Sequence, residues 1–138
     1  MMLMERKLCG ADLPSVAALA YLGDARHSLY VRRMLVERGM TKSADLNREA
    51  LKYVTCEAQA LMYDKIELLL LPEEIDVFRR ASNSTHLNRP KHASGRDYRR
   101  ATGFEAVIGM LEWLGNTERL ELLLNKSHEK DDTNDSEN

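Results

Sequence analysis

Apolar residues recur at helical spacing along most of the chain, and the alternation of apolar and polar residues that is typical of strands is not apparent. Long stretches of Ala, Leu, Met, Glu, Lys and Arg also favour helix. We therefore predict an all-α fold. The expected helices run from near Pro14 to before Gly39, from about Asp45 to Leu71, over 72–83, from about Arg96 to about Leu114 and from about Thr117 to Lys126.

Proline and glycine mark the expected ends of these helices. Pro14 suits the first turn of a helix, and Gly39 suits the stop at its end. Pro72 ends the second helix and begins the third. The segment 81–95 is rich in turn formers and has no apolar period, so we expect an exposed loop there.

A stripe of helical spacing follows one face of the second expected helix. Its members are Leu46, Ala50, Tyr53, Val54, Glu57, Ala60, Leu61 and Met62. A mostly apolar stripe identifies the face that a helix turns to the interior. We therefore expect most of these residues to lie in the core.

The length of 138 residues and the hydrophobic content of 43% fit a single domain with its own core, for which we predict residues 1–126. Residues 127–138 are polar and acidic, so we expect a disordered tail. Cys9 and Cys56 are too few for a disulfide framework or a thiolate metal site. Neither a signal peptide nor a membrane span is recognisable, and we expect a cytoplasmic protein with no membrane association.

The formal net charge of −2 hides an asymmetry along the chain. Residues 126–138 carry −3, whereas residues 79–100 carry +6, with six arginines and Lys91 against Asp97. Such a segment has the charge of a phosphate-binding surface, and a solvated basic loop explains the charge equally well. The acidic total therefore does not exclude a nucleic-acid partner.

Two acids lie on expected helices with no basic residue within reach on the same face. The neighbours of Asp24 are Ala17, Ala20, Tyr21, His27, Ser28 and Val31, while Arg26 and Arg33 point nearly the opposite way. The neighbours of Glu105 are Tyr98, Ala101, Thr102, Ile108, Gly109 and Glu112. A carboxylate on such a face is costly to desolvate and needs a tertiary partner. That partner is either a shared magnesium or manganese ion or a separate arginine for each acid, and spacing alone favours the arginines.

Three segments carry a resemblance to a known family. "LAYLGDARHSLYVR" resembles the signature helix of the ribonuclease III endonuclease domain, and "ATGFEAVIGMLE" resembles the second acidic segment of that family. Between them, "RRASN" followed by "PKHASGRDYRRATGFEA" resembles the pattern of Mini-III, the short branch of the family. The likeness covers residues 13–125, and the segments occur in the family's order.

The resemblance implies a helical bundle like the ribonuclease III endonuclease domain, acting as a homodimer whose two active sites line a valley for double-stranded RNA. It also implies hydrolysis of phosphodiesters in both strands with Mg²⁺, or Mn²⁺, which leaves 5′-phosphates and 3′-hydroxyls. No separate double-stranded RNA-binding domain is recognisable, as in Mini-III. Because Mini-III proteins mature the ends of large-subunit (23S) ribosomal RNA, we infer a precursor of that RNA as the substrate.

Residue by residue, Asp24 matches the aspartate after glycine in the signature, and Glu105 matches the glutamate of the second segment. The resemblance implies that both are catalytic metal ligands. Full-length members carry further acids where this chain has Ala17, Ala20 and Thr102. Two carboxylates leave most of the coordination to waters and phosphate oxygens. Thr102 lies one turn from Glu105, where it is placed to hydrogen-bond a water of the ion.

Four residues of the basic segment are expected to contact the RNA. They are Arg80, Asn83, Lys91 and Arg99. Double-stranded RNA is recognised mainly by shape, through phosphates and 2′-hydroxyls. Outside this segment, we expect His27 to be a packed residue rather than a ligand. Tyr21 stands where the family has an aromatic residue near its dimer contact.

Two other functions remain open at this point. Some ribonuclease III folds are non-catalytic RNA-binding scaffolds, but such domains lose their acidic ligands and this chain keeps Asp24 and Glu105. A helical protein-interaction module unrelated to RNA predicts no salt-sensitive RNA binding, and the basic segment disfavours it.

Overall fold

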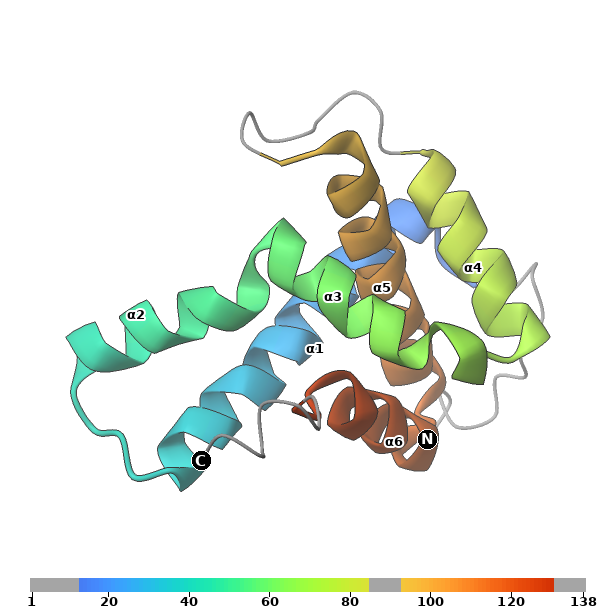
Figure 1. Ribbon diagram of the computed structural model, residues 1–138. Helices are drawn as coiled ribbons and strands as arrows, with labels where there is room; N and C mark the ends of the chain where they lie inside the picture. Colours follow the sequence, from blue (N-terminus) through green and yellow to red (C-terminus); the bar gives the residue numbers. More distant parts are fainter. Residues whose placement is uncertain (1–12, 85–92, 131–138) are drawn as a thin grey trace.

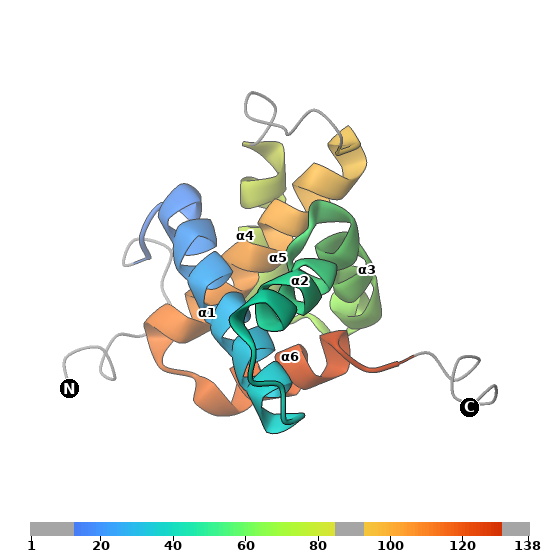
Figure 2. The same cartoon turned by 90° about the vertical axis from the view of Figure 1, so that its left-hand side faces the viewer.

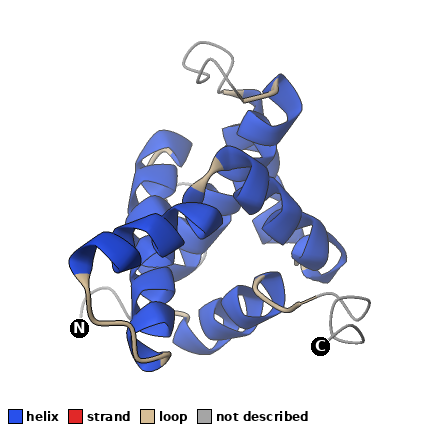
Figure 3. Cartoon of the chain, turned by 60° about the vertical axis from the view of Figure 1, so that its left-hand side comes forward, coloured by secondary structure: helices blue, strands red, loops and turns tan. Residues whose placement is uncertain are grey.

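The computed structural model describes residues 13–84 and 93–130, which form six α-helices and one short 3₁₀ turn and contain no strand (Figures 1 and 3). The elements are α1 (Val16–Glu37), α2 (Ser43–Val54), α3 (Cys56–Ile66), η3 (Glu67–Leu69), α4 (Pro72–Asn83), α5 (Gly95–Leu114) and α6 (Thr117–Ser127). The all-α prediction is confirmed. None of these helices combines the length and the apolar character that a membrane span needs.

Helix α5 is the centre of the fold and packs against α1, α3, α4 and α6 (Figures 1 and 2). Its buried residues occupy every side of the helix over more than two turns. They are Ala101, Gly103, Phe104, Ala106, Val107, Ile108, Gly109, Met110 and Leu111. A helix that is apolar all round has to be enclosed by other elements. Helices α1, α3, α4 and α6 therefore surround α5 and form the core with it.

Helices α1 and α5 cross in backbone contact at two glycines. A Cβ atom on Gly23 would lie 2.8 Å from the backbone nitrogen of Gly109 and would overlap the carbonyl oxygen of Glu105. A Cβ atom on Gly109 would in turn overlap the carbonyl oxygen of Leu19. Only residues without a side chain allow two helices to approach this closely. The crossing brings Asp24, the residue after Gly23, next to the turn of α5 that carries Glu105.

The prediction of one helix from about Asp45 to Leu71 is wrong, because the chain turns at Thr55 and forms two helices, α2 and α3. The Thr55 backbone is extended (φ −73°, ψ 160°), and its hydroxyl accepts a 3.2 Å hydrogen bond from the Ala58 amide at the start of α3. Helix α2 contains no buried residue, and Leu61 of α3 is 64% exposed. Of the expected core stripe, only Ala60 and Met62 are buried, so the prediction that most of it lies in the core is wrong.

The expected loop and tail also differ from the observed ends of the helices. Helix α4 continues to Asn83, and Ala93 is buried, so the expected exposed loop over 81–95 includes ordered residues at both ends. Ser127 is the buried last residue of α6, so the folded part of the chain continues past the expected boundary at residue 126. Residues 85–92 and 131–138 lie outside the described residues.

Candidate active site

Asp24 on α1 and Glu105 on α5 line the same open hollow, and their carboxyl groups are close enough for Asp24 to raise the pKa of Glu105. Asp24 is exposed, whereas Glu105 is partly buried. In the part of the chain that the structure describes, no lysine or arginine forms an ion pair with either carboxylate. The fold thus brings together the two acids that the sequence singled out, and it does not give each its own guanidinium.

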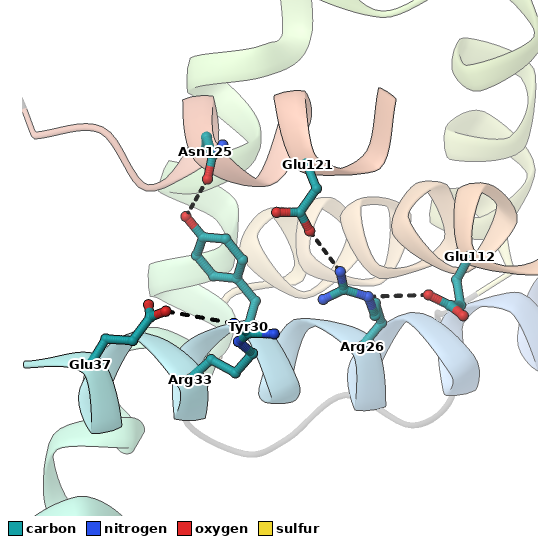
Figure 4. A network of polar contacts seen from close by, with 7 residues as sticks. All are labelled: Arg26, Tyr30, Arg33, Glu37, Glu112, Glu121 and Asn125. Carbon is teal, nitrogen blue, oxygen red and sulfur yellow. Dashed lines mark hydrogen bonds and ion pairs between the residues drawn. The ribbon is translucent and has the colours of Figure 1, made fainter. Parts of the chain in front are cut away.

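Arg26 and Arg33 of α1 are engaged by glutamates and form no ion pair with Asp24 (Figure 4). The guanidinium of Arg26 lies 3.1 Å from the carboxylate of Glu112 and 2.7 Å from that of Glu121. Arg33 pairs with a glutamate one turn further along α1. The two ion pairs of Arg26 connect α1 to the end of α5 and to α6, so they stabilise the helix packing, and the Arg33 pair lies within α1; all of them leave the Asp24 carboxylate unneutralised.

The pKa of Glu105 is raised to about 8. Burial is the largest cause, and the hydrogen bond with Asp24 and the charge of Asp24 are the next. A hydrogen bond from Gln59 acts in the opposite direction. Two carboxylates at this separation cannot both ionise without mutual repulsion, which a divalent cation between them removes. No group of three or more His, Cys, Asp and Glu side chains among the described residues is arranged to hold a metal. Two carboxylates are hard oxygen donors, which fits an ion such as Mg²⁺ or Mn²⁺ that takes its remaining ligands from water and substrate.

An open hollow of about 440 Å³ lies beside the two carboxylates. Its walls come from the first half of α1, from the first half of α5 and from the residue after α4. The lining residues besides the two acids are Val16, Ala17, Ala20, Tyr21, Ser84, Tyr98 and Thr102. The short side chains of Ala17 and Ala20 leave the space beside Asp24 that the sequence predicts. The sequence analysis did not identify Ser84, because only its place after the basic end of a helix distinguishes it.

Gln59 of α3 is a residue of this region that the sequence analysis did not identify. Its side chain is 2% exposed, and its Nε2 atom lies 3.4 Å from Glu105 Oε2 and 3.2 Å from His27 Nδ1. A buried amide needs such partners, because an unpaired one is costly. One feature of the sequence could have identified Gln59: it is a polar residue between Ala58 and Ala60, within a segment that we expect to lie mostly in the core.

His27 is fully buried and is a packed residue, as predicted. Its Nε2 atom lies 2.9 Å from Nε2 of His128, and its ring meets the ring of Phe104 edge-on at 5.3 Å between centroids. Burial, with a smaller contribution from the neighbouring His128, lowers the pKa of His27 to about 3. Burial, with smaller contributions from the positive charges of Lys65 and Arg38, lowers the pKa of His128 to about 4. Both imidazoles are therefore neutral near pH 7.

Three of the four expected RNA contacts lie where α4 ends and α5 begins, next to the hollow. Arg80 and Asn83 are exposed on the last turns of α4, and Arg99 is exposed near the start of α5. The hydroxyl of Ser82 donates a 3.0 Å hydrogen bond to the carbonyl of Arg99, which holds the two helix ends together. The fourth residue, Lys91, lies outside the described residues.

Arg100, another arginine of the basic segment, is turned toward the protein. Its guanidinium lies 3.4 Å from Asp64 and 3.6 Å from Glu67, and it covers the ring of Tyr63 at 5.2 Å. An arginine engaged by two carboxylates and an aromatic ring is a structural residue. The positive charge available to a phosphate partner is therefore smaller than the sequence total of the segment.

Comparison with known proteins adds independent information. The Ribonuclease III domain family matches residues 17–114, which include both Asp24 and Glu105. The chain is 43% identical over 109 residues to Mini-ribonuclease 3 of Streptococcus pneumoniae, with 78% of this chain and 85% of the relative covered. It is 43% identical over 106 residues to Mini-ribonuclease 3 of Symbiobacterium thermophilum, with 77% and 82% covered. A crystal structure of a protein from Fusobacterium nucleatum matches with a TM-score of 0.75 at 30% identity, covering 83% of this chain and 92% of that one.

Proposed function

The chain belongs to the ribonuclease III family, and on that premise we propose that it is a divalent-metal-dependent endoribonuclease that cleaves double-stranded RNA. One observation carries the proposal: Asp24 and Glu105 meet at an open hollow without a cation of the chain between them. Keeping two facing carboxylates has a cost in stability that RNA binding alone does not require. This cost disfavours the alternative of a non-catalytic RNA-binding domain.

Asp24 and Glu105 are the residues that would hold Mg²⁺ or Mn²⁺. When bound, the ion supplies a water of lowered pKa and neutralises the charge that develops on the scissile phosphate and on the departing 3′ oxygen. The carboxyl group of Glu105, with a pKa of about 8, retains a proton near neutral pH until a cation displaces it. Neither acid has to serve as the general base in this arrangement.

Other groups of the hollow suit a phosphodiester beside the two acids. Ala17 and Ala20 leave room for the RNA backbone next to Asp24. The hydroxyl of Thr102, one turn from Glu105, is placed to hydrogen-bond a water or a phosphate oxygen. Hydrolysis in this orientation leaves a 5′-phosphate and a 3′-hydroxyl.

The RNA contacts in this proposal are Arg80, Asn83, Lys91 and Arg99. Exposed arginines bind phosphates irrespective of sequence, which suits a duplex recognised by shape. We propose a precursor of large-subunit ribosomal RNA as the substrate and the cytoplasm as the compartment. The resemblance to Mini-III supports this choice of substrate.

We also propose that the chain acts as a homodimer. Tyr21 projects from α1 at the edge of the hollow and is 84% exposed. A large aromatic side chain in that position is suited to bury its ring against a second copy. Two copies would then present two carboxylate pairs to one duplex, which fits cleavage of both strands.

A cleavage assay tests the proposed function. The purified chain should cut long double-stranded RNA with Mg²⁺ and should leave it intact with EDTA. Asp24→Asn and Glu105→Gln should each lower the rate by orders of magnitude and keep the circular dichroism spectrum, while Glu118→Gln, at an exposed acid of α6, should cut normally. Wild-type RNA binding without cleavage would instead support the scaffold alternative, and a normal rate in Asp24→Asn would contradict the proposed site.

A further inference from the structure

A line of buried and partly buried hydrogen bonds runs from the Glu105 carboxylate to the residue that follows α6. Gln59 Nε2 lies 3.4 Å from Glu105 Oε2 and 3.2 Å from His27 Nδ1. His27 Nε2 in turn lies 2.9 Å from Nε2 of His128. The side chains of Gln59 and His27 are 2% and 0% exposed, so water does not replace these partners. The line thus joins α5, α3, α1 and the end of α6.

The chemistry of the four groups determines the direction of each bond. The amide nitrogen of Gln59 only donates, so its two hydrogens are directed to the Glu105 carboxylate and to Nδ1 of His27. His27 therefore accepts at Nδ1 and carries its proton on Nε2. That proton is donated to Nε2 of His128, which must be an acceptor. A proton on Nε2 of His128 would place two donors face to face.

His128 is held in a position where its ring can accept. Its backbone N–H donates a 3.1 Å hydrogen bond to the carbonyl of Leu124, which ties it to α6. Its ring lies 4.7 Å from the ring of Tyr30 and 5.7 Å from that of Tyr53, between centroids. Its low pKa keeps the imidazole neutral at physiological pH. The line is therefore complete under the conditions in which the protein works.

We propose that Gln59 is a positioning residue for the metal-ligating carboxylate of Glu105, and that His27 and His128 set the orientation of its amide. The inference rests on the proposed function, because it concerns the carboxylate that would hold the ion. Removing a group that orients a metal ligand without touching the metal typically changes affinity or activity about 10- to 100-fold. Because the 3.4 Å contact is long for a hydrogen bond, we expect an effect of about 10-fold.

Binding of Mn²⁺ to the full chain without RNA tests the proposal. Gln59→Met removes both N–H donors and keeps the length of the side chain. The Kd for Mn²⁺, followed through the electron paramagnetic resonance signal of the free ion, should rise about 10-fold. In the cleavage assay the Mg²⁺ concentration for half-maximal rate should rise in parallel, with little change in the rate at saturating Mg²⁺.

A second variant and a matched control complete the design. His128→Phe keeps an aromatic ring against the tyrosines but removes the acceptor for His27, so the Kd for Mn²⁺ should rise in the same direction by a smaller factor. Ser127→Ala removes a buried hydroxyl that bonds only within α6, one residue before His128. Its Kd should equal that of the wild type. An unchanged Kd in folded Gln59→Met, or an equal rise in Ser127→Ala, overturns the inference.

Other results would contradict the proposed function rather than the role of Gln59. A wild-type chain that does not bind Mn²⁺, or an Asp24→Asn variant that binds it as tightly as wild type, contradicts the metal site itself. If Gln59→Met does not fold, His128→Phe and the wild-type protein decide the question. Long-range ¹⁵N–¹H spectra of the wild-type histidines should show His27 with its proton on Nε2, and a proton on Nδ1 overturns the inference.

Discussion

Gly23 of α1 and Glu105 of α5 are in backbone contact, so that a Cβ atom at position 23 would overlap the Glu105 carbonyl oxygen. Asp24 follows Gly23 directly, and the contact therefore determines how closely the two carboxylates approach. Gly109, one turn further along α5, makes the reciprocal contact with α1. The geometry of the candidate site is a consequence of this helix crossing.

Gly23→Ala should destabilise the protein by about 3 kcal/mol, near the upper end of overpacking costs, because the obstructing atoms belong to a helix backbone and cannot rotate away. Urea unfolding followed by circular dichroism measures this loss. Ala25→Ser adds one atom at an exposed position of the same helix and should change the free energy of unfolding by less than about 0.5 kcal/mol. Equal stability of the two variants would show that the crossing is looser than described.

Asp24→Asn should stabilise the metal-free protein at pH 8. The pKa of Glu105 is about 8 in the fold against 4.5 ordinarily, so the unfolded chain loses this proton first and stability falls as pH rises from 4.5 to 8. Removing the Asp24 charge should recover about 1 kcal/mol at pH 8 and less at pH 5, measured by urea unfolding in EDTA. Added Mg²⁺ should then stabilise the wild type and not the variant. Identical pH profiles for the two proteins would contradict the coupling between the carboxyl groups.

Acidification below pH 6.5 should destabilise the fold through His27 and His128. Their pKa values of about 3 and 4 lie below the ordinary value of 6.5, so between these limits the unfolded chain takes up protons that the folded chain excludes. Each histidine can lower the free energy of unfolding by up to about 1.4 kcal/mol for each unit by which the pH falls within this range. Urea unfolding at pH 7 and pH 5 should show a smaller loss for His128→Phe. A loss of the same size in both proteins would contradict a neutral, partly buried His128.

Arg99→Gln should weaken binding to double-stranded RNA and make it less sensitive to salt. Each phosphate contact that is lost reduces the slope of log affinity against log salt concentration by about 1. The measurement is made in an Asp24→Asn background, so that the RNA is not cut during titration. Arg48→Gln, at an exposed arginine of α2, is the matched control and should keep both affinity and slope. If Arg99→Gln keeps the wild-type slope of log affinity against log salt concentration, Arg99 does not contact the RNA.

The sequence by itself determined the features that depend on neighbouring residues in the chain. Gly39, with a φ of 91° that glycine readily adopts, follows α1, and Pro72 is the first residue of α4. The 3.6-residue period also predicted that Arg26 turns away from Asp24. Helix ends marked by glycine or proline, and the directions of side chains around one helix axis, are local properties that can be predicted from the sequence.

Only the tertiary structure decided which helix faces meet. The contact of His128 with His27 and the position of Gln59 beside Glu105 depend on contacts between segments far apart in the chain. Helical periodicity orients a side chain about its own axis, but close packing of all the buried faces together selects the partner that it meets. The approach of Asp24 to Glu105 follows from that packing, through two glycines that let the backbones touch.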